Sequence, residues 1–338
     1  MLATMRTNFD SSDILPPGST AAVADALVVQ AVGPEATDEQ KAELGPEKLR
    51  EALDQWIDQA LKDSERPSFD VLPRAVVVPH VDYPRGWLNY ANVWGRLRVV
   101  DRPDRVLVLG TNHFGDATGI CCCDKGFRSP LGECPLDREL EQAIRAKLGD
   151  KPFENRFDHE NEHSIELQIP WIQHCLGANE SGAFCPVFGV LVHDPAVNNG
   201  ASYDGNGVDL QAFLDAMGEA LEELGGTTLI VSSADLSHVG PAFGDQQPLA
   251  GDEDAPKQFR EGVVQRDREM LEQLVANKPD DLVSSMAWQG NPTRWCSVGN
   301  LVAGFKLAQP QSVELLNYAA AMDQQGMGMV SSAAMVLN

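Results

Sequence analysis

The feature that most constrains the fold of this chain is a set of three short apolar runs that each end in polar side chains. The runs and their polar followers are residues 75–79 with His80, residues 105–110 with His113, and residues 228–233 with Asp235 and His238. Such runs of Val, Ile and Leu, bounded by Gly or Pro, are typical of strands in a parallel or mixed sheet. Because ligands of open α/β sheets bind at the carboxyl ends of the strands, we expect these side chains to share one site.

Helical patterns alternate with the strand-like runs along most of the chain. Apolar stripes at helical spacing cover residues 46–61, 135–148, 209–224 and 256–276. Residues 184–192 are a further expected strand, and residues 313–320 and 328–337 are expected to form a final hairpin. This order predicts an α/β fold, a three-layer α/β/α sandwich around a central mixed, largely parallel sheet.

The N-terminal part of the chain has a different composition from the rest. Residues 1–44 are rich in Ala, Pro, Gly, Ser, Thr and acidic side chains and show little amphipathic periodicity before Pro46. We therefore expect a loosely ordered extension over residues 1–44, followed by a single domain over residues 45–338. Pro46 is expected to open the first helix, since proline is favoured in the first helical turn.

The net charge and the length of the apolar runs argue against some classes of binding partner. The 338 residues include 50 acidic and 26 basic side chains, a net charge of −24, which opposes binding to nucleic acid or anionic lipid. The N-terminus lacks a signal-peptide pattern, and no apolar run approaches the ~20 residues of a membrane span. We expect a cytoplasmic protein with neither nucleic acid nor membrane as partner, and the oligomeric state stays open.

Cysteine usage fits a reducing compartment. The seven cysteines are an odd number, and three of them form the triplet Cys121, Cys122 and Cys123. A sequential triplet is unlike a spaced metal-binding or redox pair. It is better explained as a strand that uses cysteine as a small apolar residue.

Histidines at strand ends have an ordinary structural explanation as well as a functional one. A lone histidine after a strand is more often hydrogen-bonded to nearby backbone than bound to a ligand. His80 and His113 both lie in turns rich in Gly or Pro, which expose side chains at a sheet edge. Their joint occurrence favours a site, whereas His174 and His193 lack this setting and are expected to be structural.

Two further segments carry candidate groups. Residues 158–166 include Glu162 and His163, which could bind a metal or move protons, although acidic residues are also common at an ordinary helix start. Cys296 precedes an expected helix over residues 297–305. A thiol at a helix N-terminus has a lowered pKa, so we expect an accessible thiolate, the alternative being a buried, inert thiol.

Taken in order, these segments resemble the Memo family, the AmmeMemoRadiSam system protein B group, which is similar in fold to class III extradiol dioxygenases of the LigB type. The resemblance rests on five segments between about residues 74 and 304: residues 79–83, 109–113, 161–166, 232–238 and Cys296. It implies a LigB-like α/β/α sandwich with a mononuclear site at the sheet edge.

The resemblance also implies roles for individual residues. His80, His113 and Cys296 match the family's metal-binding positions, and His238 and Asp235 match its catalytic positions. Two imidazoles and one anionic ligand leave coordination sites open, as in non-haem iron oxygenases. A thiolate in place of a carboxylate favours copper or redox-active iron, so ring-cleaving activity does not follow directly.

Together with these residues, the resemblance implies a metalloprotein with a mononuclear iron or copper centre and oxygen-dependent, dioxygenase-like redox chemistry, acting on an unidentified small molecule or peptide. His238, oriented by Asp235, is expected to be the acid or base, with Glu162 and His163 as further catalytic groups. One alternative is a metal-free cysteine hydrolase in which His238 activates Cys296. Another is a non-enzymatic module that binds a peptide or protein in the same crevice.

Overall fold

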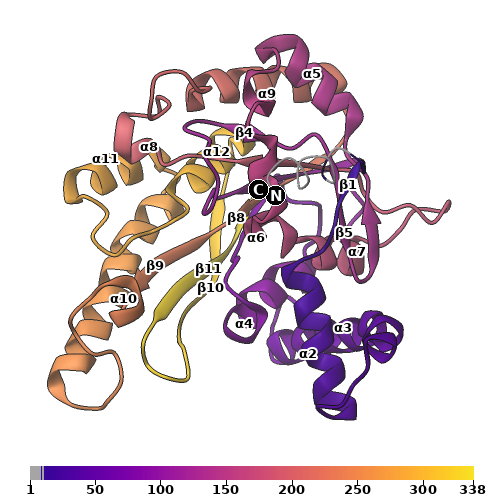
Figure 1. The fold of residues 1–338 in the computed structure, drawn as a ribbon. Helices are drawn as coiled ribbons and strands as arrows, with labels where there is room; N and C mark the ends of the chain where they lie inside the picture. The colour runs from indigo at the N-terminus through magenta and orange to yellow at the C-terminus, as the bar shows by residue number, and fades with distance from the viewer. Residues whose placement is uncertain (1–8, 10) are drawn as a thin grey trace.

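The computed structural model describes residue 9 and residues 11–338, and a mixed sheet of eight strands lies at the centre of that part of the chain (Figure 1). The strands are β2 (Ala75–Val78), β3 (Arg105–Gly110), β4 (Cys121–Cys122), β7 (Val187–Leu191), β8 (Thr228–Ser233), β9 (Asp235–Val239), β10 (Val313–Met322) and β11 (Met329–Leu337). Their order is β10, β11, β2, β8, β3, β7, β4, and β9 also pairs with β11. The central strands β2, β8, β3 and β7 are parallel, and the flanking pairs are antiparallel.

The two faces of the sheet contact different sets of helices. In β2, Ala75 and Val77 belong to one buried apolar cluster, whereas Val76 and Val78 belong to another. This alternation is what strand geometry dictates. The first cluster contains α5 (Arg138–Leu148), α9 (Leu210–Leu224), α10 (Asp254–Val275), α11 (Pro279–Gln289) and α12 (Val298–Ala308). The second contains α3 (Asp38–Leu61), α4 (Tyr83–Trp94) and α7 (Ile169–Leu176). The predicted three-layer α/β/α sandwich is confirmed.

Smaller elements complete the fold. Two short helices are α6 (His163–Glu166) and α8 (Pro195–Asn198). A second, three-stranded sheet consists of β1 (Ile14–Leu15), β5 (Gly126–Ser129) and β6 (Gly132–Cys134). The predicted C-terminal hairpin is confirmed, with β10 and β11 paired from Val313 opposite Leu337 to Met322 opposite Met329.

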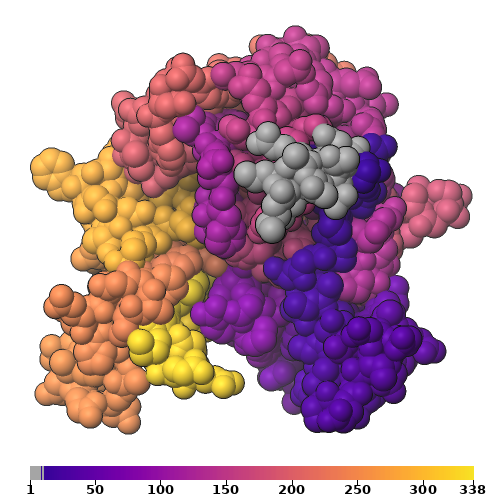
Figure 2. All heavy atoms as spheres, in the orientation of Figure 1, coloured from indigo at the N-terminus to yellow at the C-terminus, as the bar shows by residue number. Residues whose placement is uncertain are grey.

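The N-terminal segment differs from the expected loosely ordered extension. Residues 1–8 and Asp10 lie outside the described residues, but helix α2 covers Ser19–Val32. Helix α3 begins at Asp38, where Thr37 accepts a hydrogen bond from the Gln40 backbone, so Pro46 lies inside this helix and does not open it. In Figure 2 the indigo surface of these helices borders a hollow whose other side includes the C-terminal hairpin, in yellow.

The parallel strands bring the predicted polar side chains to one edge of the sheet. Because β2 pairs with β8 and β8 with β3, the segments that carry His80, Asp235 and His113 all leave the sheet at the carboxyl ends of neighbouring strands. The segment after β8 is not the helix start that we considered for the pair Asp235 and His238. It continues as strand β9, which pairs with β11. None of the helices in the described residues is both long and apolar enough to span a bilayer.

Candidate metal centre

His80 follows β2 and is held in one orientation by two hydrogen bonds. Its side chain is 1% exposed, and its Nδ1 lies 2.9 Å from the carbonyl oxygen of Ser233, to which it can only donate. Its backbone N–H donates to Oδ1 of Asp235 over 3.0 Å. Burial lowers the pKa of His80 to about 4, although the charge of Asp235 acts in the opposite direction. His80 is therefore a neutral imidazole with an unprotonated Nε2, the form that binds metal ions.

His113 follows β3 and is held by Glu162. The His113 backbone N–H donates to Oε2 of Glu162 over 2.7 Å, and Nδ1 lies 3.1 and 3.2 Å from the two carboxylate oxygens. A donating Nδ1–H again leaves Nε2 as the nitrogen with a free electron pair. A carboxylate that fixes the tautomer of an imidazole in this way is a usual partner of metal-binding histidines.

Glu162 holds a second imidazole, that of His163. Nδ1 of His163 lies 3.3 Å from Oε1 of Glu162, and the Ser164 backbone N–H donates to the same oxygen over 2.8 Å. Burial by itself would raise the pKa of Glu162, but the hydrogen bonds from His113 and His163 outweigh it and hold this pKa far below its usual range. Burial lowers the pKa of His163, and its hydrogen bond with Glu162 more than offsets this, so the net shift is upward.

His113, Glu162 and His163 also have possible metal-binding atoms within 4.8 Å of one another. In the hydrogen-bonding pattern observed, however, both Nδ1 atoms and two backbone N–H groups are directed at the Glu162 oxygens. The carboxylate is thus fully used in orienting two imidazoles. We interpret Glu162 as a positioning residue and not as part of a second ion site.

Cys296 completes a group of three donor atoms. Its Sγ lies 3.3 Å from Nε2 of His80 and 3.1 Å from Oγ of Ser297. Atoms of His80, His113 and Cys296 that could bind a metal all lie within 4.8 Å of one another. Three side chains from distant parts of the sequence thus converge on one point at the sheet edge.

The expected low pKa of Cys296 was wrong. Burial, followed by the nearby charge of Asp235, raises the pKa of this thiol to about 12. The prediction considered only the helix that begins at Val298, whereas desolvation by the surrounding fold dominates. The thiol is therefore protonated at neutral pH, and a metal ion that binds there would displace its proton.

Asp235 and His238 lie at the same site but are not joined as expected. Asp235 is 2% exposed, and its carboxylate contacts His80, with Oδ2 3.6 Å from Nε2. Nδ1 of His238 instead lies 3.0 Å from the carbonyl oxygen of Leu236, to which it donates. Because this segment is a strand and not a helix start, Asp235 supports His80 and the Leu236 backbone sets the tautomer of His238.

The candidate residues surround one cavity of about 480 Å³. Its lining includes the imidazoles of His80, His113, His163 and His238 together with Asp235. The geometry thus brings together every candidate that the sequence proposed, since Glu162 and Cys296 lie directly behind these imidazoles. Their roles as ligands or as acid and base groups stay predictions.

Several groups at this site were not found in the sequence. The Ser233 carbonyl that fixes His80 is a backbone atom, so no residue type could have revealed it. The hydroxyl of Ser297 is hydrogen-bonded to the Cys296 thiol and to the Thr111 hydroxyl. Ser297 was not singled out from the sequence, although it directly follows Cys296 in the chain. Helix α2 also lines the cavity, through Ser19, Ala22 and Val23. This contribution was missed from the sequence, since the segment was expected to be loosely ordered.

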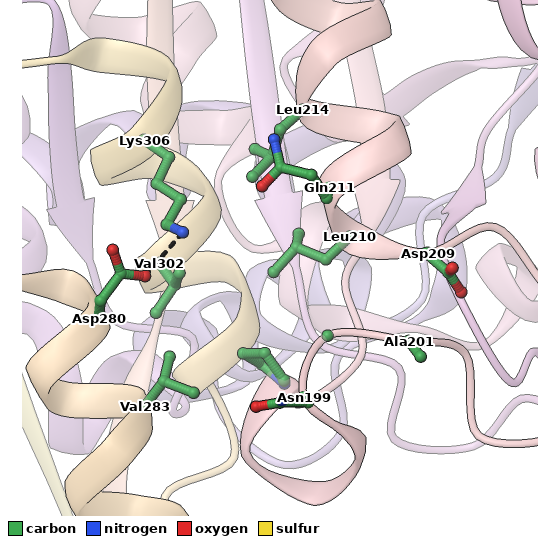
Figure 3. A pocket seen from close by; sticks show the side chains of 12 residues that line it. Asn199, Ala201, Asp209, Leu210, Gln211, Leu214, Asp280, Val283, Val302 and Lys306 are labelled. Atoms are coloured by element: carbon green, nitrogen blue, oxygen red, sulfur yellow. Dashed lines mark ion pairs between the residues drawn. The ribbon is translucent and has the colours of Figure 1, made fainter.

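A different pocket, between α8, α9, α11 and α12, lacks these groups (Figure 3). Figure 3 marks one ion pair among the side chains that line this pocket, between Nζ of Lys306 and Oδ1 of Asp280, which are 2.7 Å apart. The described residues that line it include neither histidine nor cysteine. His174 and His193 lie outside the site and make structural contacts, to Asp54 and to the Gly200 carbonyl respectively.

Comparison with known proteins gives a consistent result. A family model described as Memo-like protein matches residues 43–336. A MEMO1 family protein of Methanopyrus kandleri is 27% identical over 293 residues, which cover 83% of this chain and 89% of the relative. Another from Thermococcus onnurineus is 26% identical over 82% of this chain and 89% of the relative. A third, from Pyrococcus furiosus, is 27% identical over 74% of this chain and 80% of the relative.

Proposed function

The chain belongs to the Memo family, and from this premise we propose that it is a metalloprotein with a mononuclear iron or copper centre and oxygen-dependent, dioxygenase-like redox chemistry. The ligands in this proposal are Nε2 of His80, Nε2 of His113 and Sγ of Cys296. The observation that carries it is the convergence of these three donor atoms within 4.8 Å.

The spacing of the donors suits a single ion. Two ligands bound at ~2.1 and ~2.3 Å with a tetrahedral angle between them lie roughly 3.6 Å apart. The distance of 3.3 Å between His80 Nε2 and Cys296 Sγ is close to this value. Both imidazoles have Nδ1 occupied by an acceptor, so the electron pair on Nε2 is available. The residues present therefore fit the metal that we propose.

The nature of the donors favours two metals. A thiolate is a soft ligand that suits Cu(I) and iron, and imidazole suits both metals. Three protein ligands leave positions open, so a bound ion would supply a redox-active centre to which oxygen or a substrate can coordinate.

His238 is the residue that we propose as acid or base. Burial lowers its pKa, with a partial offset from Asp235, and its Nδ1–H donates to Leu236. It therefore offers an unprotonated Nε2 at the wall of the cavity, where it can accept and return a proton. His163, whose net pKa shift is upward, is better suited to hold a proton. Asp235 and Glu162 act by positioning His80 and His113.

The hydrolase alternative receives less support. A cysteine nucleophile needs a neighbouring base and an accessible thiolate. His238, the base in this alternative, does not contact the thiol: the hydrogen-bonding partners of Cys296 Sγ in the described structure are His80, Ser297 and the Asp235 carbonyl. Its raised pKa, about 12, also disfavours a free thiolate.

Metal content tests the proposal directly. Protein purified without a histidine tag is reconstituted anaerobically with Fe(II) or Cu(I), desalted and analysed for metals. We expect one ion per chain, loss of that ion in His80→Ala and retention in His174→Ala, a matched change outside the site. Oxygen consumption by the loaded protein would support the redox assignment. Failure to retain either metal would contradict the proposal.

A further inference from the structure

One wall of the cavity comes from a segment that precedes the residues matched by the family model. The model matches residues 43–336, whereas Ser19, Ala22 and Val23 of α2 line the cavity beside the histidines. This wall is thus an addition of this chain to the part it shares with the family model. A segment that contacts the cavity without supplying a metal-binding group can still decide which molecules enter it.

Glu166 fixes the beginning of α2 to the site. Its carboxylate accepts hydrogen bonds from the backbone N–H groups of Gly18, Ser19 and Thr20, over 2.9, 3.0 and 2.8 Å, and from the Thr20 hydroxyl over 2.7 Å. Thr20 is fully buried at this contact. Glu166 ends the short helix α6, which begins at His163. The start of α2 and the imidazole of His163 are therefore both attached to the short helix α6.

The cavity has a polar floor and largely apolar walls. Apart from the histidines and Asp235, its lining includes Val81, Leu167, Phe243 and Val330 in addition to Ala22 and Val23. The Phe243 ring packs edge-on against His238, with centroids 5.2 Å apart. At the rim, Nε of Arg85 donates to Asp82 over 2.7 Å, so this cation already has an acidic partner. The walls thus offer contact area to an apolar group and no uncompensated charge.

We infer that Ala22 and Val23 of α2 are specificity-determining residues, and that the site takes a small molecule with a metal-binding head and an apolar body. The inference rests on the proposed function, because the head must coordinate the metal. A cavity of about 480 Å³ is in the range of small-molecule sites. A docked helix across one side leaves less room for a polypeptide than an open groove would. The peptide-binding alternative is correspondingly disfavoured.

The test compares two probe molecules that carry the same metal-binding imidazole ring, only one of which also carries an apolar phenyl group. Full-length protein is loaded with Co(II), whose absorption reports ligand exchange, and titrated with imidazole and with 4-phenylimidazole. Burial of the phenyl ring against the apolar walls should make 4-phenylimidazole bind at least about tenfold more tightly than imidazole.

Substitutions in α2 identify the wall. Ala22 is exposed at the mouth of the cavity, so Ala22→Trp adds bulk there without disturbing the core. We expect it to lower the preference for 4-phenylimidazole at least about fivefold and to change imidazole binding less than about twofold, since a ring that cannot enter buries no area. Ala26→Trp is the matched control, because Ala26 is exposed one turn later and does not line the cavity.

A second variant tests the anchor. In Glu166→Gln an amide N–H₂ faces groups that also donate, so α2 should loosen. Hydrogen exchange of the α2 amides should become faster, and the preference for 4-phenylimidazole should fall. If Ala22→Trp and Ala26→Trp show the same preference as the wild type in loaded protein, this inference is wrong and the metal proposal stands. If the chain takes up none of Co(II), Fe(II) and Cu(I), the metal proposal fails and this inference fails with it.

Discussion

The imidazole of His80 and the thiol of Cys296 lie 3.3 Å apart although 216 positions separate them in the chain. His80 reaches this point because it follows β2, and Cys296 because it comes just before α12, which packs on β8 and β2. The two side chains therefore meet only in the folded protein. Their contact places one soft and one borderline donor on the same side of the cavity, and the first prediction depends on it.

Cys296→Ser is expected to weaken metal binding and leave the fold intact. A serine hydroxyl is a poor anionic ligand at neutral pH, so affinity should fall at least about 100-fold, the upper end of the loss typical for residues that merely support ligands. The free energy of unfolding of the metal-free protein should change by less than about 1 kcal/mol, since Cys296 is only partly buried and a hydroxyl can keep the hydrogen-bonding partners of its Sγ. Metal titration and urea unfolding measure the two quantities.

The control for this prediction is Cys175→Ser on α7. Cys175 is buried and lies outside the site. Its replacement should lower stability by about 1–3 kcal/mol because a hydroxyl is buried in apolar surroundings, and it should leave the metal affinity unchanged. Equal metal stoichiometry and affinity in Cys296→Ser and the wild type would show that Cys296 is not a ligand.

Glu162→Gln is expected to reduce metal affinity without removing a ligand. The variant replaces one acceptor oxygen by an amide donor, so it cannot hold the Nδ1–H groups of His113 and His163 and both backbone N–H groups at once. Loss of such a supporting carboxylate typically costs 10–100-fold in affinity, and we expect about that range here. Glu160→Gln, the same change two positions earlier, should have little effect in the same titration.

His238→Ala is expected to retain the metal and lose turnover. His238 borders the cavity, but it is not among the groups of His, Cys, Asp and Glu in the described residues that could jointly hold an ion. Removing a proton-transfer residue typically lowers the rate by ~10²–10⁴. Metal analysis and oxygen consumption of the loaded variant check both parts. Loss of the metal would make His238 a ligand, and undiminished turnover would exclude it from catalysis.

Strand positions could be predicted from sequence because they depend on local patterns. Residues 105–110 and 228–233 form strands with the predicted bounds, since a buried run of β-branched residues has few other stable arrangements. Their parallel order then determines that His113 and Asp235 share an edge. The identity of the three proposed ligands came from resemblance to the Memo family, and the structure adds that they converge.

The errors concern features that depend on distant residues. Helix α2 is anchored by Glu166, which is 146 positions from Thr20, and no local pattern in residues 1–44 reveals this contact. The pKa of Cys296 follows from its burial and from Asp235, not from the helix beside it. Likewise, β9 forms because β11, almost 100 residues later, offers it a partner, and this pairing separates His238 from Asp235.

Asp267→Asn is expected to destabilise the protein strongly. Asp267 is fully buried, and its carboxyl group accepts hydrogen bonds from Ser237 Oγ, Trp295 Nε1, Tyr318 OH and Ser331 Oγ. An amide nitrogen in place of one oxygen would leave two donors without an acceptor. At about 1–3 kcal/mol for each unsatisfied buried group, the loss should be about 2–6 kcal/mol in the free energy of unfolding. Asp252→Asn, at an exposed position, should change stability by less than about 0.5 kcal/mol.

The last prediction concerns acid sensitivity and uses His159, which is 3% exposed and lies near the site without belonging to it. Its Nε2 donates to the Cys121 carbonyl over 3.2 Å, and burial lowers its pKa to about 4 from the ordinary value of 6.5. Between these two pH values the unfolded chain binds a proton that the folded chain does not. The contribution of His159 to the free energy of unfolding is therefore fully present above pH 6.5 and is lost as the pH falls toward 4.

This shift corresponds to about 3 kcal/mol, at ~1.4 kcal/mol for each pH unit. His159→Gln removes the titrating group, so the variant should lose less stability than the wild type between pH 7 and pH 4.5. Urea unfolding of both proteins at several pH values measures the difference. His80, whose pKa is also lowered to about 4, is present in both proteins and cancels in the comparison. Identical pH dependence in the two proteins would show that His159 is not held neutral by burial.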